Sequence, residues 1–181
     1  ERRRKEKNFG KMIKEVKKEF NNIDILINNT SISIDNELLS KSKEEFMKVL
    51  EVNTYGTFLI SREVIKHLSV KTIINISSTD ALNTYNELSV DYCVSKAGVN
   101  ILTKIFALKF KDIKTICLAP NWIDTESVRE MYPEYLNNEL KRIGQKQLLS
   151  VTEVSKKIYS MVDDNNIKSG DIIRMDGESN A

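Results

Sequence analysis

The sequence predicts an α/β fold in which helices cover both faces of a parallel sheet. Four short and nearly continuous apolar runs, rich in β-branched residues, are typical of strands buried on both faces. These runs are IDILINN (23–29), KTIINIS (71–77), IKTICLA (113–119) and DIIRMD (171–176). Longer segments with helical patterning separate them, and connections of this length favour parallel strands joined by crossover helices.

The segments between the runs have the apolar spacing of helices. We expect helices over residues 7–20, 43–68, 89–110 and 151–162. Ser42 and Glu45 have the spacing of a capping box, and Thr152 is the expected N-cap of the last helix. Because no internal repeat or linker interrupts the pattern, residues 1–181 are predicted to form one domain.

The composition argues against several classes of protein. With 28 basic and 26 acidic residues the net charge is +2, so the overall charge predicts neither a nucleic-acid nor a membrane partner. The basic opening ERRRKEK is expected to be a solvated helix start, with a nucleic-acid arm as the alternative. No apolar run approaches the length of about eighteen residues typical of a membrane span, and no Cys/His spacing suits a metal. Cys93 and Cys117 form no C-x-x-C pair, so we expect a cytoplasmic protein. From the start of the sequence we expect no signal peptide.

Polar and turn-forming residues follow three successive predicted strands. They are NNTS at 28–31, SSTD at 77–80 and PNWI at 120–123. In an open α/β sheet, ligands bind beyond the carboxyl ends of the strands. We therefore expect the functional site among these residues.

The stretch VDYCVSKAGVN (90–100) places Tyr92 and Lys96 four positions apart, so both lie on one face of the predicted helix. A tyrosine has a pKa near 10 and is a poor proton donor or acceptor at neutral pH. A nearby ammonium favours the phenolate and is expected to lower the pKa of Tyr92 toward the working pH. A general acid–base group acts best in that range. The pair therefore indicates proton transfer to or from a substrate oxygen.

Several motifs together resemble the short-chain dehydrogenase/reductase family, and most closely its 3-oxoacyl-acyl-carrier-protein reductase type. YCVSK resembles the family's Tyr-x-x-x-Lys, IINISS its strand with the catalytic Ser, and LEVNTYGTFLIS the helix with its catalytic Asn. IDILINNTSIS, LAPNWIDTE and IKSGDIIRMDG resemble three further family segments, in the family's order and over nearly the whole chain. The resemblance implies a Rossmann-like doubly wound sheet and an NAD(P)-dependent enzyme that reduces a ketone by hydride transfer.

The resemblance also implies four catalytic residues. Tyr92 would be the acid/base and Lys96 its electrostatic partner. Ser78 would steady the substrate oxygen, although Thr79 lies at the family's usual spacing, thirteen residues before Tyr92. Asn53 would bend its helix and hold a water of the proton relay, with a mid-helix Asn bonded to its own backbone as the alternative.

The implied cofactor is NADP or NAD, with NADP preferred because of the family. Residues matching the family's cofactor contacts are Asn29, Thr30, Ser31, Tyr92, Lys96, Pro120, Asn121, Ile123 and Thr125. Asn121 replaces a family glycine, and we expect it to supply the positive φ that asparagine tolerates.

The chain departs from the family at its start. The family begins with a strand, a Gly-rich turn and a helix that receives the pyrophosphate, but the six glycines here lie too far apart for such a loop. We expect a partial domain of a longer protein, with roughly 60 to 70 residues before Glu1. The alternative is a cofactor-free remnant that serves as an interaction or dimerisation module.

The family also suggests the partners. Its helices that match those of Asn53 and Tyr92 pack against a second subunit, so we expect a homodimer or homotetramer. The substrate would be a small-molecule or carrier-bound carbonyl compound, such as a 3-oxoacyl thioester. Arg129, Lys141 and Arg142 in the polar segment 126–149 would then meet an acidic carrier.

Overall fold

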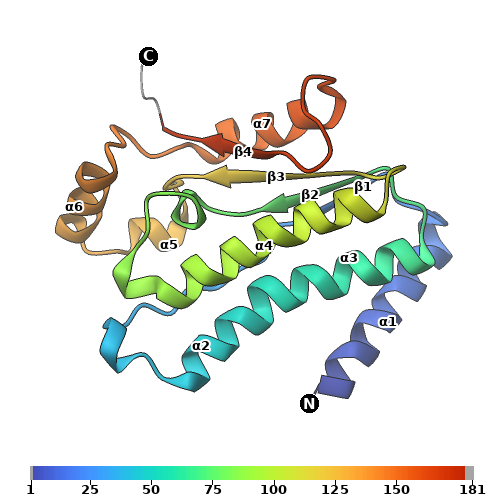
Figure 1. The fold of residues 1–181 in the computed structure, drawn as a ribbon, viewed down its shortest axis with the longest axis horizontal. Coiled ribbons are helices and arrows are strands. Elements are labelled where there is room, and N and C mark those ends of the chain that lie inside the picture. Colours follow the sequence, from blue (N-terminus) through green and yellow to red (C-terminus); the bar gives the residue numbers. More distant parts are fainter. Residues whose placement is uncertain (1, 178–181) are drawn as a thin grey trace.

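The sheet has four parallel strands with helices on both faces (Figure 1). The computed structural model describes residues 2–177, with side chains from residue 10 onward. The strands are β1 (Ile25–Asn28), β2 (Thr72–Ile76), β3 (Lys114–Pro120) and β4 (Ile172–Met175), adjacent in that order. Each lies within one of the predicted runs or one residue beyond it, and the predicted α/β class is confirmed. The basic segment 1–7 lies outside the described side chains, so its two interpretations stay open.

The strand register brings the three polar strand ends to one edge of the sheet. Asn28 of β1 lies beside Asn75 of β2, and Asn75 lies beside Cys117 of β3. All four strands run in the same direction. The loops after β1, β2 and β3 therefore leave the sheet together, as the strand-end argument predicts.

Two apolar clusters hold helices on opposite faces of the sheet. The helices α1 (Arg2–Phe20), α2 (Lys43–Leu50), α3 (Gly56–His67) and α4 (Val90–Lys109) lie on one side, and α7 (Val151–Asp163) lies on the other (Figure 1). On β2, Ile73 packs toward the first group, whereas its neighbour Ile74 packs toward α7. This alternation follows from the two-residue period of a strand, and it explains why β2 is buried along its whole length.

The long helix predicted over 43–68 contains one π-helical turn, η2 (Glu51–Tyr55), between α2 and α3. The capping box of Ser42 and Glu45 is present at the start of α2. The N-cap prediction for α7 is wrong by two residues. Ser150, not Thr152, caps this helix, because Ser150 has a glutamate at the N3 position, Glu153, to complete a second capping box.

Short helices and turns surround the carboxyl edge of the sheet. The 3-10 turns η1 (Leu38–Ser40), η3 (Thr79–Ala81) and η4 (Glu87–Ser89) follow β1 and β2, and α5 (Glu126–Arg129) and α6 (Pro133–Ile143) follow β3. α6 begins with Pro133 in its first turn and ends at Gly144, whose φ of 73° suits glycine. Of these pieces, η3, η4 and α5 contribute residues to the cavity at this edge.

Candidate active site

Tyr92 and Lys96 project from the first two turns of α4 toward the carboxyl end of β2. The Lys96 ammonium lies 5.4 Å from the centre of the Tyr92 ring. It donates a hydrogen bond of 2.8 Å to the carbonyl oxygen of Ile76, the last residue of β2. Only 2% of Lys96 is exposed. The pair predicted from the sequence therefore forms one side of a site at the predicted sheet edge.

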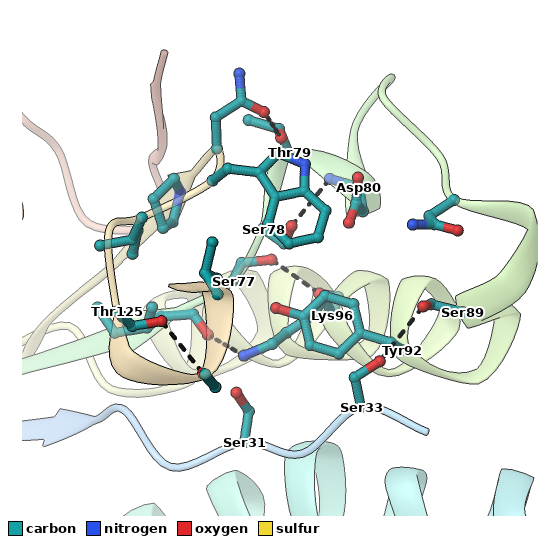
Figure 2. Close-up of a pocket in the computed structure, with 18 of the residues that line it drawn as sticks. Ser31, Ser33, Ser77, Ser78, Thr79, Asp80, Ser89, Tyr92, Lys96 and Thr125 are labelled. Carbon is teal, nitrogen blue, oxygen red and sulfur yellow. Dashed lines mark hydrogen bonds between the residues drawn. The ribbon is translucent and has the colours of Figure 1, made fainter. Parts of the chain in front are cut away.

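A cavity of about 340 Å³ opens at this edge (Figure 2). Most of the predicted site residues line it: Asn29, Ser31, Ser78, Tyr92, Lys96, Pro120, Asn121, Ile123 and Thr125. Thr30 and Asn53 do not appear among its lining residues. The cavity thus brings together residues from the loops after β1, β2 and β3 and from α4.

The structure separates the roles of Ser78 and Thr79. Ser78 caps η3, where its hydroxyl accepts the Asp80 N–H at 3.1 Å, and it also interacts with Tyr92. Thr79 is 1% exposed, its hydroxyl donates to Asn121 Oδ1, and the Thr84 hydroxyl lies 3.0 Å away. Since structural partners occupy the Thr79 hydroxyl, Ser78 is the better candidate to meet a substrate.

Burial dominates the electrostatics of the pair. Burial raises the pKa of Tyr92 well above its usual value, the Asp80 carboxylate raises it further, and the Ser78 hydroxyl opposes both. Burial lowers the pKa of Lys96 to about 8. The expected lowering of the Tyr92 pKa is therefore wrong for this structure. The physical reason is that the Lys96 ammonium is bonded to Ile76 while the phenol is desolvated.

Asn53 lies within the π-helical turn η2, so the local distortion expected of its helix is present. Its side chain exchanges two hydrogen bonds of 2.9 Å with the backbone of Ile32 and donates a third, also 2.9 Å, to Ser95 Oγ. The side chain thus bonds outside its own helix, unlike the alternative interpretation. It fastens the loop after β1 to α4.

Asn121 does not adopt the positive φ expected of a glycine replacement, because Asn21 is the only non-glycine residue with positive φ in the described chain. Instead the Asn121 side chain forms a bridge. It accepts the Thr79 hydroxyl and donates to Asp176 Oδ1 at 2.9 Å. The turn after β3 is therefore held by side-chain hydrogen bonds between the ends of β2 and β4.

Sequence analysis placed Asp80 in an expected site segment without giving it a role, and it missed Asp35. Asp35 and Asp80 line the cavity, and Asp35 Oδ1 accepts the hydroxyls of Ser33 (2.8 Å) and Ser89. A second missed feature is the ion pair between Lys41 and Asp91, 3.2 Å long, whose side chains are 3% and 0% exposed. The partners lie far apart in the chain, and no local spacing signals them.

The lining residues suit the nicotinamide half of a dinucleotide cofactor. Asn29, Ser31, Asn121 and Thr125 offer amide and hydroxyl groups, and Lys96 offers an ammonium, for a ribose and a carboxamide. The described residues contain no Gly-rich turn for the pyrophosphate.

Within the described part of the chain, no group of three or more His, Cys, Asp or Glu could hold a metal ion. A search of the same residues finds no helix with the length and apolarity to cross a membrane.

Known proteins are similar to this chain in sequence and in fold. The family model described as Enoyl-(Acyl carrier protein) reductase matches residues 4–177. The 3-oxoacyl-(acyl-carrier-protein) reductase FabG of Thermotoga maritima is 27% identical over 92% of this chain and 70% of its own length. The 7alpha-hydroxysteroid dehydrogenase of Clostridium sardiniense is 27% identical over 96% of this chain and 70% of its own length.

A solved dehydrogenase/reductase structure from Sinorhizobium meliloti 1021 superimposes with a TM-score of 0.86 at 22% identity, covering 97% of this chain and 71% of that one. The structural match shows the fold, and the family model covers nearly the whole sequence. Short-chain dehydrogenases/reductases are enzymes that generally use NAD(H) or NADP(H). The chain therefore belongs to the short-chain dehydrogenase/reductase family.

Proposed function

We propose that this protein is an NAD(P)-dependent oxidoreductase that reduces a ketone to a secondary alcohol. The observation that supports the proposal is the convergence of Tyr92, Lys96 and Ser78 on one cavity at the carboxyl edge of the sheet. A phenol, an ammonium and a hydroxyl are the groups needed to protonate and steady a carbonyl oxygen as it gains charge. NADP is the preferred cofactor because of the family resemblance, with NAD as the alternative.

In this mechanism, Tyr92 donates its proton to the substrate oxygen, and Ser78 donates a hydrogen bond to the same oxygen. Lys96 supplies positive charge beside the phenol, and its ammonium would hold the ribose of the cofactor. Asn53 joins the loop after β1 to Ser95 of α4, and a relay water would be held beside it. The bound cofactor would supply the hydride, with Asn29, Thr30, Ser31, Pro120, Asn121, Ile123 and Thr125 as its proposed contacts.

A fluorescence titration of the purified chain with NADPH and, separately, NADH tests the cofactor part of the proposal. We expect saturable binding of at least one of them. Absence of binding by both would mean that the chain lacks what the cofactor's phosphates need, as expected of a partial domain or of the second candidate function, a cofactor-free interaction module. Proteins carrying Ser78→Ala or Thr79→Ser provide the next comparison, since only the former should lower turnover strongly.

An exposed apolar stripe on α4 favours self-association, which both candidate functions share. Val94, Ile101, Ile105 and Leu108 are 44%, 55%, 53% and 72% exposed. Burial of such a stripe against a second copy would remove apolar surface from water. We propose a homodimer or homotetramer, and light scattering of Ile101→Glu and Ile105→Glu variants would detect its loss.

The two free cysteines, Cys93 and Cys117, support the proposed cytoplasmic location.

A carrier-bound 3-oxoacyl thioester is the substrate that the resemblance suggests. Of the residues expected to meet an acidic carrier, Arg129 is bonded to Asp124 through two nitrogens, and Arg142 is similarly bonded to Glu139. Those guanidinium groups therefore already have anionic partners within the chain. The cavity itself supports a different substrate class.

A further inference from the structure

The catalytic cavity has one polar wall and one apolar wall. Its polar wall comes from the loop after β1 and from the segment between β2 and α4: Ser33, Asp35, Asp80, Asn86 and Ser89. Figure 2 shows Ser33, Asp80 and Ser89 on the side of the cavity that holds Tyr92. The apolar wall follows β3 and contains Trp122, Val128 and Met131. A ligand that fits must offer hydrogen-bonding groups to one wall and apolar surface to the other.

The charges of this cavity disfavour an anion. Of the described residues that line it, Asp35 and Asp80 are acidic and Lys96 alone is basic. The Lys96 ammonium is already bonded to Ile76 O. Arg142 also acts on Asp80, from outside the lining, but its guanidinium is bonded to Glu139. Two carboxylates against one ammonium leave the lining net acidic, and like-charge contacts select against an anionic ligand.

Hydrogen bonds orient the Asp35 and Asp80 carboxylates so that they can accept hydroxyl groups of a ligand. Asp35 Oδ1 accepts the Ser33 and Ser89 hydroxyls, and Asp80 Oδ1 accepts the Thr84 hydroxyl at 2.6 Å. These bonds fix both side chains before a ligand arrives. Because a carboxylate offers about four lone-pair sites, each retains capacity to accept further donors. The Trp122 ring offers a flat apolar surface for the C–H face of such a ligand.

The cavity is also small. Its volume of about 340 Å³ lies near the lower end of the range for small-molecule sites, which is roughly 300 to 1,000 Å³. Because the nicotinamide half of the cofactor would share this cavity, the space beside Tyr92 suits a compact molecule better than an extended acyl chain.

We propose that the substrate is a neutral, polyhydroxylated carbonyl compound of monosaccharide size, with Asp35 and Asp80 as the specificity residues that accept its hydroxyl groups. This inference rests on the proposed function. It identifies the substrate class by the hydrogen-bond acceptors, the net acidity and the volume of the cavity that holds Tyr92.

The test compares kcat/KM for D-fructose, a neutral polyol ketone, with kcat/KM for acetoacetyl-coenzyme A, an anionic thioester. We expect the wild type to prefer the polyol. Asp35→Asn and Asp80→Asn should each lower the ratio of the two constants by roughly 10-fold or more, since hydrogen bonds to charged groups are the stronger ones. The ratio cancels any effect on Tyr92 that all substrates share. Asp112→Asn, an exposed aspartate outside the cavity lining, is the matched control and should leave the ratio unchanged.

A wild-type preference for the thioester, or a ratio unchanged in both variants, would overturn the inference. Saturation-transfer NMR with D-fructose adds a readout that needs no turnover, and binding that weakens in both variants is expected. No D-fructose binding by the wild type would also overturn the inference. Reduction of diacetyl, a neutral diketone without hydroxyls, tests the proposed function separately. Failure of the substrate inference can therefore be distinguished from failure of the proposed reductase function.

Discussion

The buried ion pair of Lys41 and Asp91 gives a prediction about how the site is held together. Asp91 directly precedes Tyr92 in α4, and its Oδ1 accepts the Tyr92 N–H at 2.9 Å. Its other oxygen, Oδ2, forms the ion pair with the Lys41 ammonium, at 3.2 Å. In the described structure this oxygen is buried and accepts no hydrogen bond, so the ion pair is its only polar contact among the described residues. Lys41 also donates to the carbonyl oxygen of Ile34, in the loop whose residues Ile32 and Ser33 line the cavity. The pair therefore joins the loop after β1 to the helix of Tyr92.

Replacing Lys41 by methionine leaves the Asp91 carboxylate buried without its counter-charge. Removing one partner of a buried pair costs roughly 3–5 kcal/mol in the free energy of unfolding. With a urea m-value of roughly 2 kcal/mol/M, this loss lowers the unfolding midpoint by about 1.5–2.5 M. The fluorescence of Trp122, the single tryptophan, reports the transition.

Two controls make this prediction refutable. The double variant Lys41→Met with Asp91→Asn should recover most of the loss, because it leaves no buried charge and keeps an acceptor for the Tyr92 N–H. Lys71→Met removes an ion pair to Asp24 that is 80% and 75% exposed, and its midpoint should stay near that of the wild type. A loss in Lys41→Met no larger than that in Lys71→Met would refute the reasoning.

Three further predictions concern a helix cap, a helix contact and the acid/base group. Ser150→Ala should destabilise the protein by about 1 kcal/mol, measured by urea unfolding, whereas Thr152→Ala should not, because Ser150 makes the capping box of α7. Gly98→Leu should lower the melting temperature measured by calorimetry, since a Cβ at Gly98 would lie 2.8 Å from Thr54 Cγ2 where α4 meets η2; a stable variant would contradict that contact. Asp80→Asn should lower the pKa of Tyr92, because the Asp80 carboxylate raises it, and should move the pH profile of alcohol oxidation to lower pH. A profile unmoved or moved upward would count against this electrostatic assignment.

The sheet and the pair of Tyr92 and Lys96 could be predicted because their signals are local. Continuous apolar runs identify strands buried on both faces, as in β2, and a four-residue spacing puts Tyr92 and Lys96 on one helix face. The cap of α7 was also within reach, since Ser150 and Glu153 have the spacing that correctly identified Ser42 and Glu45.

The rest of the site depends on contacts between distant segments. Asp35 and Ser89 are 54 residues apart, and only the fold brings them together in the cavity. The Asn121 backbone was misjudged because its side chain bonds to Thr79 and Asp176, at the ends of two other strands. The direction of the Tyr92 pKa depends on burial and on Asp80, and neither follows from the spacing to Lys96.

The most direct test of the account is the turnover of a carbonyl substrate by the Tyr92→Phe variant, with cofactor binding measured on the same sample. We predict that turnover falls by about 100-fold or more, because the proton donor is lost, while NADPH or NADH still binds through the other proposed cofactor contacts. Turnover that persists in Tyr92→Phe at the wild-type rate would contradict the assignment of Tyr92 as the acid/base group.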